Sequence, residues 1–397
     1  MQLREGIPLF VLDRGIQPII KLEVLFESGT WYEPQHGVAY FTANMLREGT
    51  QKRNAREIAA YVDQYGANLD IDIKPDYCSI ELTTLSKHLS PMLALLAEIL
   101  LEPTFPAEQL CLLQNLKTQA IKIEDEQYNQ VARKQFRAIV LGKQHPYGRS
   151  LTAEAIAAIT PEHLQQYYKE RLLAGCRILM SGQVSDQDIQ AVQHHLQHLP
   201  RQQPATIHYP LSAKATAKVH IPKAGSLQSS INIGKILFTK DHPDYLPMHF
   251  FSELLGGYFG SRLMRNIREE KGYTYGIHAK IIPLKHISYF LITTEVVLAF
   301  SEQACHEIYQ EIKALQTQEV PQEELQKLRS YLIGTFLAAV SDPFAIMEKF
   351  KEAHLYGLGS DFYKQFYDTV SHISASQIRK LANQYLAIDS LSEVRVG

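Results

Sequence analysis

The same order of predicted elements occurs twice along the chain, and this internal repeat restricts the fold more than any other feature. Each half opens with two strands and continues with two helices, a hairpin and long helices. In the first half these elements are predicted at 8–12, 18–26, 37–46, 55–65, 69–85, 91–101 and 107–126. In the second half they are predicted at 219–221, 230–238, 244–255, 261–270, 275–296, 300–316 and 321–340. The period of about 200 residues is far longer than the ~20–50 residues of a solenoid repeat, so it indicates a duplicated domain.

Strands that alternate with helices but pair as hairpins predict two α+β domains, each a largely antiparallel sheet packed with helices. We place these domains at 1–200 and 211–397. The polar stretch 193–210, which is rich in Gln and His and contains three prolines, is the predicted junction of the two domains. The chain has 397 residues, of which 45% are hydrophobic, and this is enough for a core in each domain.

Charge and cysteine content exclude several classes of function. The chain has 40 basic and 42 acidic residues, so it lacks the basic excess of a nucleic-acid-binding protein. The four cysteines are scattered without a C-x-x-C pair, which argues against a zinc ribbon, a redox motif and a disulfide scaffold. The most apolar stretch, 91–101, is about half the ~20 residues that a spanning helix needs. We therefore expect neither nucleic acid nor a membrane span.

The segment GVAYFTANMLREGT at 37–50 resembles the active-site helix of the pitrilysin-type zinc peptidases, the inverted zincins, whose signature is H-x-x-E-H. Six positions fit the phrase around that signature: Gly37, Ala39, Phe41, Met45, Gly49 and Thr50. The chemical positions differ, because Tyr40 and Asn44 replace the histidines and Ala43 replaces the glutamate. The family's third ligand, a glutamate further along the chain, falls at Gln119. Tyrosine and asparagine are poor zinc ligands and alanine cannot act as a base, so we expect no metal in this chain.

The segment LLGGYFGSRLMRNIREEKGYTYGIHA at 254–279 resembles the metal-free half of the same family. In that half a glycine-rich loop leads into a helix that ends in an arginine, and a tyrosine follows seven residues later. Arg268 and Tyr275 occupy these positions. In the family this pair binds the substrate carbonyl at the zinc site, so the resemblance implies the same catalytic role for it here.

Three glycines in this segment, Gly256, Gly257 and Gly260, are predicted to form a loop that a substrate peptide can approach. The order G-G-x-x-G lacks the G-x-G-x-x-G spacing of a dinucleotide site, so we do not expect a phosphate cradle. A purely structural Arg268 is the alternative to the catalytic role, because the helix macrodipole favours arginine in a last turn.

With HPYG at 145–148, the resemblance covers nearly the whole chain and implies the clam-shell half of the pitrilysin and mitochondrial-processing-peptidase fold. Some members place the zinc ligands and the arginine–tyrosine pair on separate subunits, and this sequence has the second pattern. The resemblance therefore implies a non-catalytic subunit of a heterodimeric zinc endopeptidase, not active alone. It would bind peptide and supply Arg268 and Tyr275 to a homologous subunit with an intact H-x-x-E-H, which would hold the zinc.

Two alternatives remain open at this point. One is a catalytically silent scaffold or peptide-binding protein of the same fold. The other is a stand-alone peptidase with unusual ligands, which the residues at 40, 43 and 44 disfavour. The isolated chain could also form a homodimer. No signal peptide is visible in MQLREGIPLFVLDRG. Exported bacterial members are common in the family, so we expect the periplasm and otherwise the cytoplasm.

Overall fold

The computed structural model describes residues 1–4, 6–210 and 216–397, and the chain divides into two compact units. Unit 1 comprises the segments 1–121, 151–209 and 339–351. Unit 2 comprises the segments 122–150, 210–338 and 352–397. Neither unit is a continuous half of the chain. Residues 122–150 of the predicted first domain lie in unit 2, and residues 339–351 of the predicted second domain lie in unit 1.

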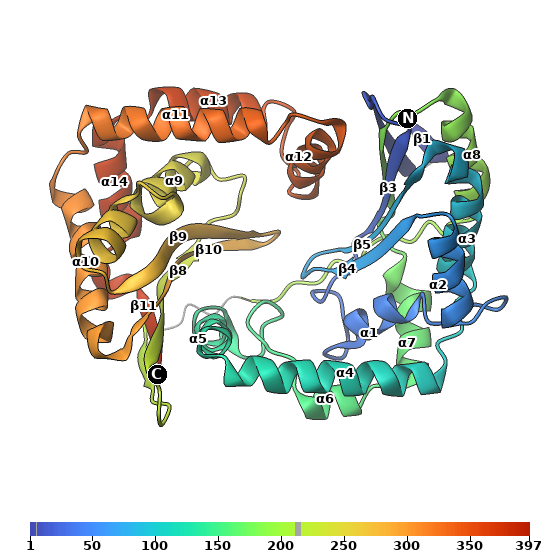
Figure 1. Ribbon diagram of the computed structural model, residues 1–397, viewed down its shortest axis with the longest axis horizontal. Helices are drawn as coiled ribbons and strands as arrows, with labels where there is room; N and C mark the ends of the chain where they lie inside the picture. Colours follow the sequence, from blue (N-terminus) through green and yellow to red (C-terminus); the bar gives the residue numbers. More distant parts are fainter. Residues whose placement is uncertain (5, 211–215) are drawn as a thin grey trace. The chain divides into compact units, whose positions relative to one another are not determined.

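Unit 1 is built on a six-stranded sheet with the order β1-β2-β6-β3-β5-β4. Figure 1 labels β1, β3, β4 and β5 of this sheet. The strands are β1 (Gln2–Arg4), β2 (Ile7–Asp13), β3 (Ile19–Phe26), β4 (Asn68–Ile73), β5 (Cys78–Leu85) and β6 (Arg177–Gly182). Neighbours are antiparallel except β2 and β6, which are parallel. The predicted hairpin at 69–85 is therefore present as β4 and β5, and β4 forms one edge of the sheet.

The two faces of this sheet differ in polarity because side chains alternate along each strand. On β3, Ile20, Leu22 and Val24 are fully buried in an apolar core that also contains residues of the surrounding helices. The alternate residues Lys21 and Glu23 lie on the opposite face.

The helices of unit 1 are η1 (Ser86–His88), α1 (Val38–Met45), α2 (Ala55–Gln64), α3 (Leu89–Leu101), α4 (Ala107–Glu126, whose last turn belongs to unit 2), α6 (Ala153–Ala157), α7 (Pro161–Tyr167), η3 (Tyr168–Leu172), α8 (Asp186–Leu196) and most of α12 (Pro343–Leu355).

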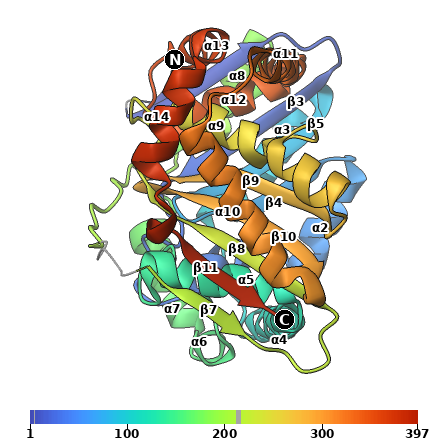
Figure 2. The ribbon, with the colours of Figure 1, turned by 90° about the vertical axis from the view of Figure 1, so that its left-hand side faces the viewer.

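Unit 2 contains a five-stranded sheet with the order β7-β11-β8-β10-β9. The strands are β7 (Lys218–Ile221), β8 (Gln228–Leu237), β9 (Thr274–Leu284), β10 (Ile287–Val297) and β11 (Ser392–Val396). The helices are α5 (Tyr128–Arg137), η2 (Ala138–Gly142), α9 (Tyr245–Ser252), η4 (Glu253–Gly257), η5 (Met264–Glu270), η6 (Leu298–Phe300), α10 (Ser301–Thr317), α11 (Gln322–Ala338), α13 (Phe362–His372), α14 (Ala375–Tyr385) and η7 (Ile388–Ser390). Figure 2 shows α10 in front of β8 and β10, both of which it contacts.

The two sheets share one topology, as expected of a duplicated domain. The order β2-β6-β3-β5-β4 in unit 1 corresponds to β7-β11-β8-β10-β9 in unit 2. In both, the last strand of the repeat inserts between the first two and runs parallel to the first. The prediction of two related α+β folds with largely antiparallel sheets is confirmed. The strands β6 and β11 were not predicted.

Within the described parts of the chain, no single helix is long and apolar enough to cross a membrane. The consecutive helices α11 and α12 reach that length and composition only when they are counted together across the break between them.

Candidate functional site

The helix α1 carries the positions that resemble a zinc site, and its start is well defined. Gly37 precedes the helix with a φ of 95°, a conformation that glycine adopts without the cost of a Cβ. The buried carboxylate of Glu33 accepts hydrogen bonds from the backbone N–H groups of Gly37 and Ala39, at 3.0 and 3.1 Å. This carboxylate satisfies two of the free N–H groups at the helix start, where the macrodipole favours negative charge.

The residues on α1 do not fit zinc. Tyr40 and Asn44 are half-buried on one face of the helix, and the amide nitrogen of Asn44 donates to the backbone oxygen of Tyr40 at 2.8 Å. Ala43 is fully buried and offers no ligand atom. The ammonium of Lys117 on α4 lies 5.0 Å from the centre of the Tyr40 ring. The positive charge of Lys117 therefore already lies beside this face of the helix. Positions 40, 43 and 44 offer no imidazole or carboxylate that could bind zinc in addition.

Gln119 is exposed on α4. The structure brings Lys117, two residues earlier on the same helix, against Tyr40. The residue of α4 that contacts this face of α1 thus has a positive side chain. A metal ligand at that place would have to be negative or neutral.

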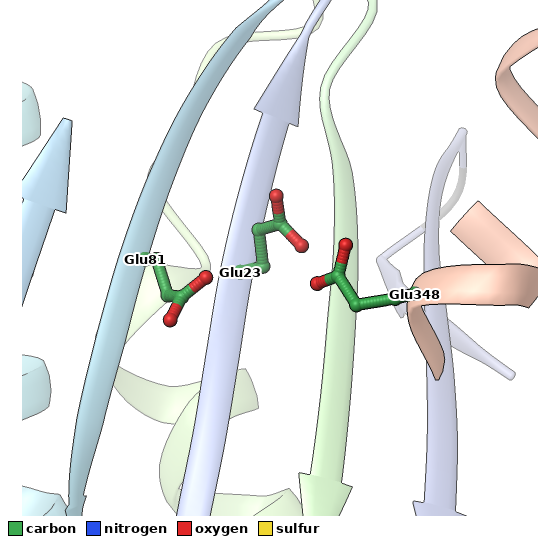
Figure 3. Close-up of side chains that lie close together, drawn as sticks. All are labelled: Glu23, Glu81 and Glu348. Atoms are coloured by element: carbon green, nitrogen blue, oxygen red, sulfur yellow. The ribbon is translucent and has the colours of Figure 1, made fainter. Parts of the chain in front are cut away.

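A separate acidic cluster lies on the polar face of the unit 1 sheet. Figure 3 shows Glu23 on β3, Glu81 on β5 and Glu348 on α12 with their carboxylates close together. In the described part of the chain, these are the three potential metal ligands that come within reach of one ion. Two lysines lie among them: Lys21 is 2.7 Å from Glu81 and 3.0 Å from Glu348, and Lys351 is 2.9 Å from Glu23 and 2.6 Å from Glu348. We interpret the cluster as an ion-pair network that holds α12 on the sheet.

The ion pairs of this network stabilise the charged forms of Glu348 and Lys351. Burial opposes the charged carboxylate of Glu348, but pairing with Lys351 and Lys21 outweighs it and lowers the pKa of Glu348. Burial likewise opposes the ammonium of Lys351, but Glu23 and Glu348 outweigh it and raise the pKa of Lys351. The hydroxyl of Ser79 also donates to Glu23.

Arg268 and Tyr275 lie on either side of a sharp turn in unit 2. The helix η5 ends in a widened turn, in which the N–H of Lys271 donates to the oxygen of Asn266 at 3.1 Å. Gly272 follows with a φ of 65°, and β9 begins at Thr274. Tyr275 is 94% exposed at the start of this edge strand. The predicted helix end at Gly272, with Arg268 in the last turn, agrees with this geometry.

Polar contacts anchor η5 and the residues just before it to the long helices of unit 2. Arg262 donates two hydrogen bonds to the carboxylate of Glu324 on α11, at 2.9 and 2.8 Å, and both side chains are largely buried. The amide of Asn266 donates to Glu311 on α10 at 2.7 Å. Such a two-pronged arginine–carboxylate pair fixes orientation as well as position.

Arg268 differs from the other arginines of this segment. Its guanidinium lies 4.8 Å from the centre of the Phe259 ring. Across residues 1–4, 6–210 and 216–397, no carboxylate pairs with it. Arg262 is paired with Glu324, and Arg265 lies 3.8 Å from the same carboxylate. Arg268 therefore keeps an uncompensated charge beside an exposed aromatic ring.

The three glycines before η5 have a packing role in the structure. Gly256 has a φ of −159° and a ψ of 17°, which are not helical values, so the helix is kinked within η4, and Gly260 lies in the loop that follows. A Cβ on Gly256 would lie 2.6 Å from the backbone nitrogen of Ala279 on β9, and a Cβ on Gly260 would lie 2.8 Å from the ring of Tyr258. Gly256 thus lets η4 pack closely on β9.

The chain belongs to peptidase family M16. Residues 13–154 match the family described as Insulinase (Peptidase family M16), and residues 158–332 match the Peptidase M16 inactive domain. The family predicted from the sequence is confirmed, and the second match identifies this chain as carrying the inactive type of M16 domain.

Individual relatives agree with this assignment. The Helicobacter pylori protein named Non-peptidase homolog YmxG is 22% identical, and the alignment covers 97% of this chain and 90% of that protein. The Bacillus subtilis protein named Uncharacterized zinc protease YmxG is 23% identical, but the alignment covers 62% of this chain and only 60% of that protein. Among solved structures, the peptidase M16 inactive domain from Pseudomonas fluorescens has a TM-score of 0.92 at 23% identity, covering 100% of this chain and 97% of the other. This likeness establishes the fold.

Proposed function

We propose that this chain is the non-catalytic subunit of a heterodimeric zinc endopeptidase. It would bind an extended peptide and place Arg268 and Tyr275 beside the zinc site of a homologous subunit. The observation that carries the proposal is the state of this pair: Arg268 has no carboxylate partner in the described chain, and Tyr275 is 94% exposed. Charged and aromatic groups that are left uncovered in this way are typical of a binding site, and here a second chain would complete that site.

The chemistry expected of the pair is stabilisation of the substrate carbonyl. As water adds to a peptide bond, negative charge develops on the carbonyl oxygen, and donors already in place lower the energy of that state. The guanidinium of Arg268 and the phenol of Tyr275 are both donors. In this proposal the partner supplies the zinc and the general base, because Tyr40, Ala43 and Asn44 can supply neither.

The first experiment is a pull-down of the tagged chain from native extract, followed by mass spectrometry. A partner of similar length with an intact H-x-x-E-H motif is the expected result. If the chain comes down alone or with unrelated proteins, the split-peptidase proposal fails. The catalytically silent scaffold then becomes the better description, in keeping with the printed name of the Helicobacter pylori relative, a non-peptidase homolog.

The second experiment uses the assembled complex and a quenched fluorescent peptide. Arg268→Ala should lower kcat/KM by roughly a hundredfold, the scale of losing one oxyanion donor. Tyr367→Ala is the matched control, because it removes an exposed aromatic side chain on α13, and it should leave turnover unchanged. Unchanged turnover in the Arg268 variant would refute the catalytic role of the pair.

We also propose that the complex works in the periplasm. Fractionation of cells that express the tagged full-length protein tests this, and recovery in the cytoplasmic fraction alone would contradict it.

A further inference from the structure

The way in which Arg268 is held suggests a role for Phe259. On the same segment, Arg262 is paired with the carboxylate of Glu324. Arg268 instead rests on an aromatic ring, at 4.8 Å from its centre. A carboxylate would neutralise the guanidinium and occupy its planar fork of N–H donors. An aromatic face holds the cation and leaves those donors available.

The backbone around Phe259 is fixed from both sides, so its ring has a defined place. The preceding residue, Tyr258, stacks on Tyr331 of α11 with ring centres 5.0 Å apart. The backbone N–H of the buried Ser261 donates to the oxygen of Tyr258 at 3.1 Å and closes a turn around Phe259. Three residues after Phe259, the chain is anchored again where Arg262 donates to Glu324.

Phe259 is nevertheless 62% exposed. An aromatic side chain on a firmly anchored turn gains little from burial when so much of its surface faces water. The ring of Phe259 instead makes a cation–π contact with the guanidinium of Arg268. We propose that Phe259 is a positioning residue, which holds the guanidinium of Arg268 in place while its N–H donors stay available for a peptide carbonyl.

This proposal rests on the proposed function, since it assigns Phe259 a role through Arg268. A cation–π contact at an exposed site is worth ~0.5–1 kcal/mol, which corresponds to about a two- to fivefold change in rate. In the assembled complex, Phe259→Ala should therefore lower kcat two- to fivefold while KM for the same fluorescent peptide changes little. Phe259→Trp should restore most of the rate, because tryptophan offers the better ring for a cation.

A double-variant cycle separates positioning from a direct role. When Arg268→Ala is already present, Phe259→Ala should have no further effect on kcat. Equal effects with and without Arg268 would overturn the proposal, and so would an unchanged kcat in Phe259→Ala alone. If Arg268→Ala is itself silent in an active complex, the proposed function fails instead.

A second readout needs no partner. In the isolated chain labelled with ¹⁵N-arginine, the Arg268 Nε–H signal of the wild type should be shifted by the Phe259 ring current. Its order parameter should fall in Phe259→Ala and recover in Phe259→Trp. Tyr367→Ala is again the control, since that ring lies on α13. An Arg268 signal that is equally mobile in wild type and Phe259→Ala would overturn the proposal.

Discussion

Replacing Lys351 by methionine tests whether ion pairs hold the segment 339–351 on unit 1. The ammonium of Lys351 lies 2.9 and 3.0 Å from the two carboxylate oxygens of Glu23, which is only 3% exposed. After the change, Glu23 keeps the hydroxyl of Ser79 but loses its counter-ion. Breaking a buried pair by removing one partner costs about 3–5 kcal/mol. Because the side chain of Lys351 retains 13% exposure, we expect a loss of about 2–3 kcal/mol in the free energy of unfolding of unit 1.

The chain offers a selective probe for this measurement. Trp31 is the single tryptophan, and it is buried in unit 1. Its fluorescence in urea therefore follows the unfolding of that unit. Lys87→Met is the matched control, because Lys87 is an exposed lysine of the same unit, and it should leave the midpoint unchanged.

A double variant distinguishes a lost attraction from a stranded charge. When Glu23→Gln accompanies Lys351→Met, the buried carboxylate without a counter-ion is gone, while Glu348 still pairs with Lys21, and more than half of the lost stability should return. The reasoning is refuted if Lys351→Met stays within about 0.5 kcal/mol of the wild type, or if the double variant is no more stable than the single one.

Three further outcomes are expected. Because the pKa of Glu348 is lowered in the folded state, its contribution is present above the ordinary value of 4.5 and is lost as the pH falls below it. The urea midpoint reported by tryptophan fluorescence should thus drop in acid, and Glu348→Gln should reduce that drop. Gly272→Ala should destabilise unit 2 by about 1–2 kcal/mol, because alanine is strained at a φ of 65°. No atom would crowd the new Cβ, so the backbone conformation alone causes this loss. Circular dichroism in urea measures it, and an unchanged unfolding curve would contradict it. Restoring histidine, glutamate and histidine at 40, 43 and 44 should not restore zinc binding while Lys117 remains, and one equivalent of zinc by mass spectrometry after dialysis would show the opposite.

The sequence predicts the repeat, the hairpins and most long helices because those elements carry strong local patterns. It does not predict β6 or β11, although both are central strands. RILMSG and SEVRV are buried along almost their whole length, so they lack the alternation of buried and exposed positions that indicates a strand, and their place in the sheet depends on residues far away in the chain. The assignment of 122–150 and 339–351 to the opposite units has the same cause, since packing partners and not local patterns decide it.

The candidate site divides in a similar way. The positions of Arg268 and Tyr275 could be predicted, because the helix end at Gly272 is a local signal. The contact of Lys117 with Tyr40 could not, because it depends on how α4 is rotated against α1. Phe259 was also missed, although an aromatic residue in a glycine-rich turn three residues before Arg262 was visible in the sequence.

The insertion of the last strand of each repeat into the middle of its sheet has a consequence for biosynthesis. While the ribosome is still producing residues before 177, β2 and β3 each lack the neighbour that separates them in the finished sheet. Unit 1 also lacks its segment 339–351 until late in synthesis. When that segment leaves the ribosome, most of unit 2 has already emerged. Long-range pairings of this kind are slow to form and leave strand edges open to other chains. A fragment that stops at the 193–210 junction would therefore lack a part of its own fold, and we expect it to need the rest of the chain to become fully native.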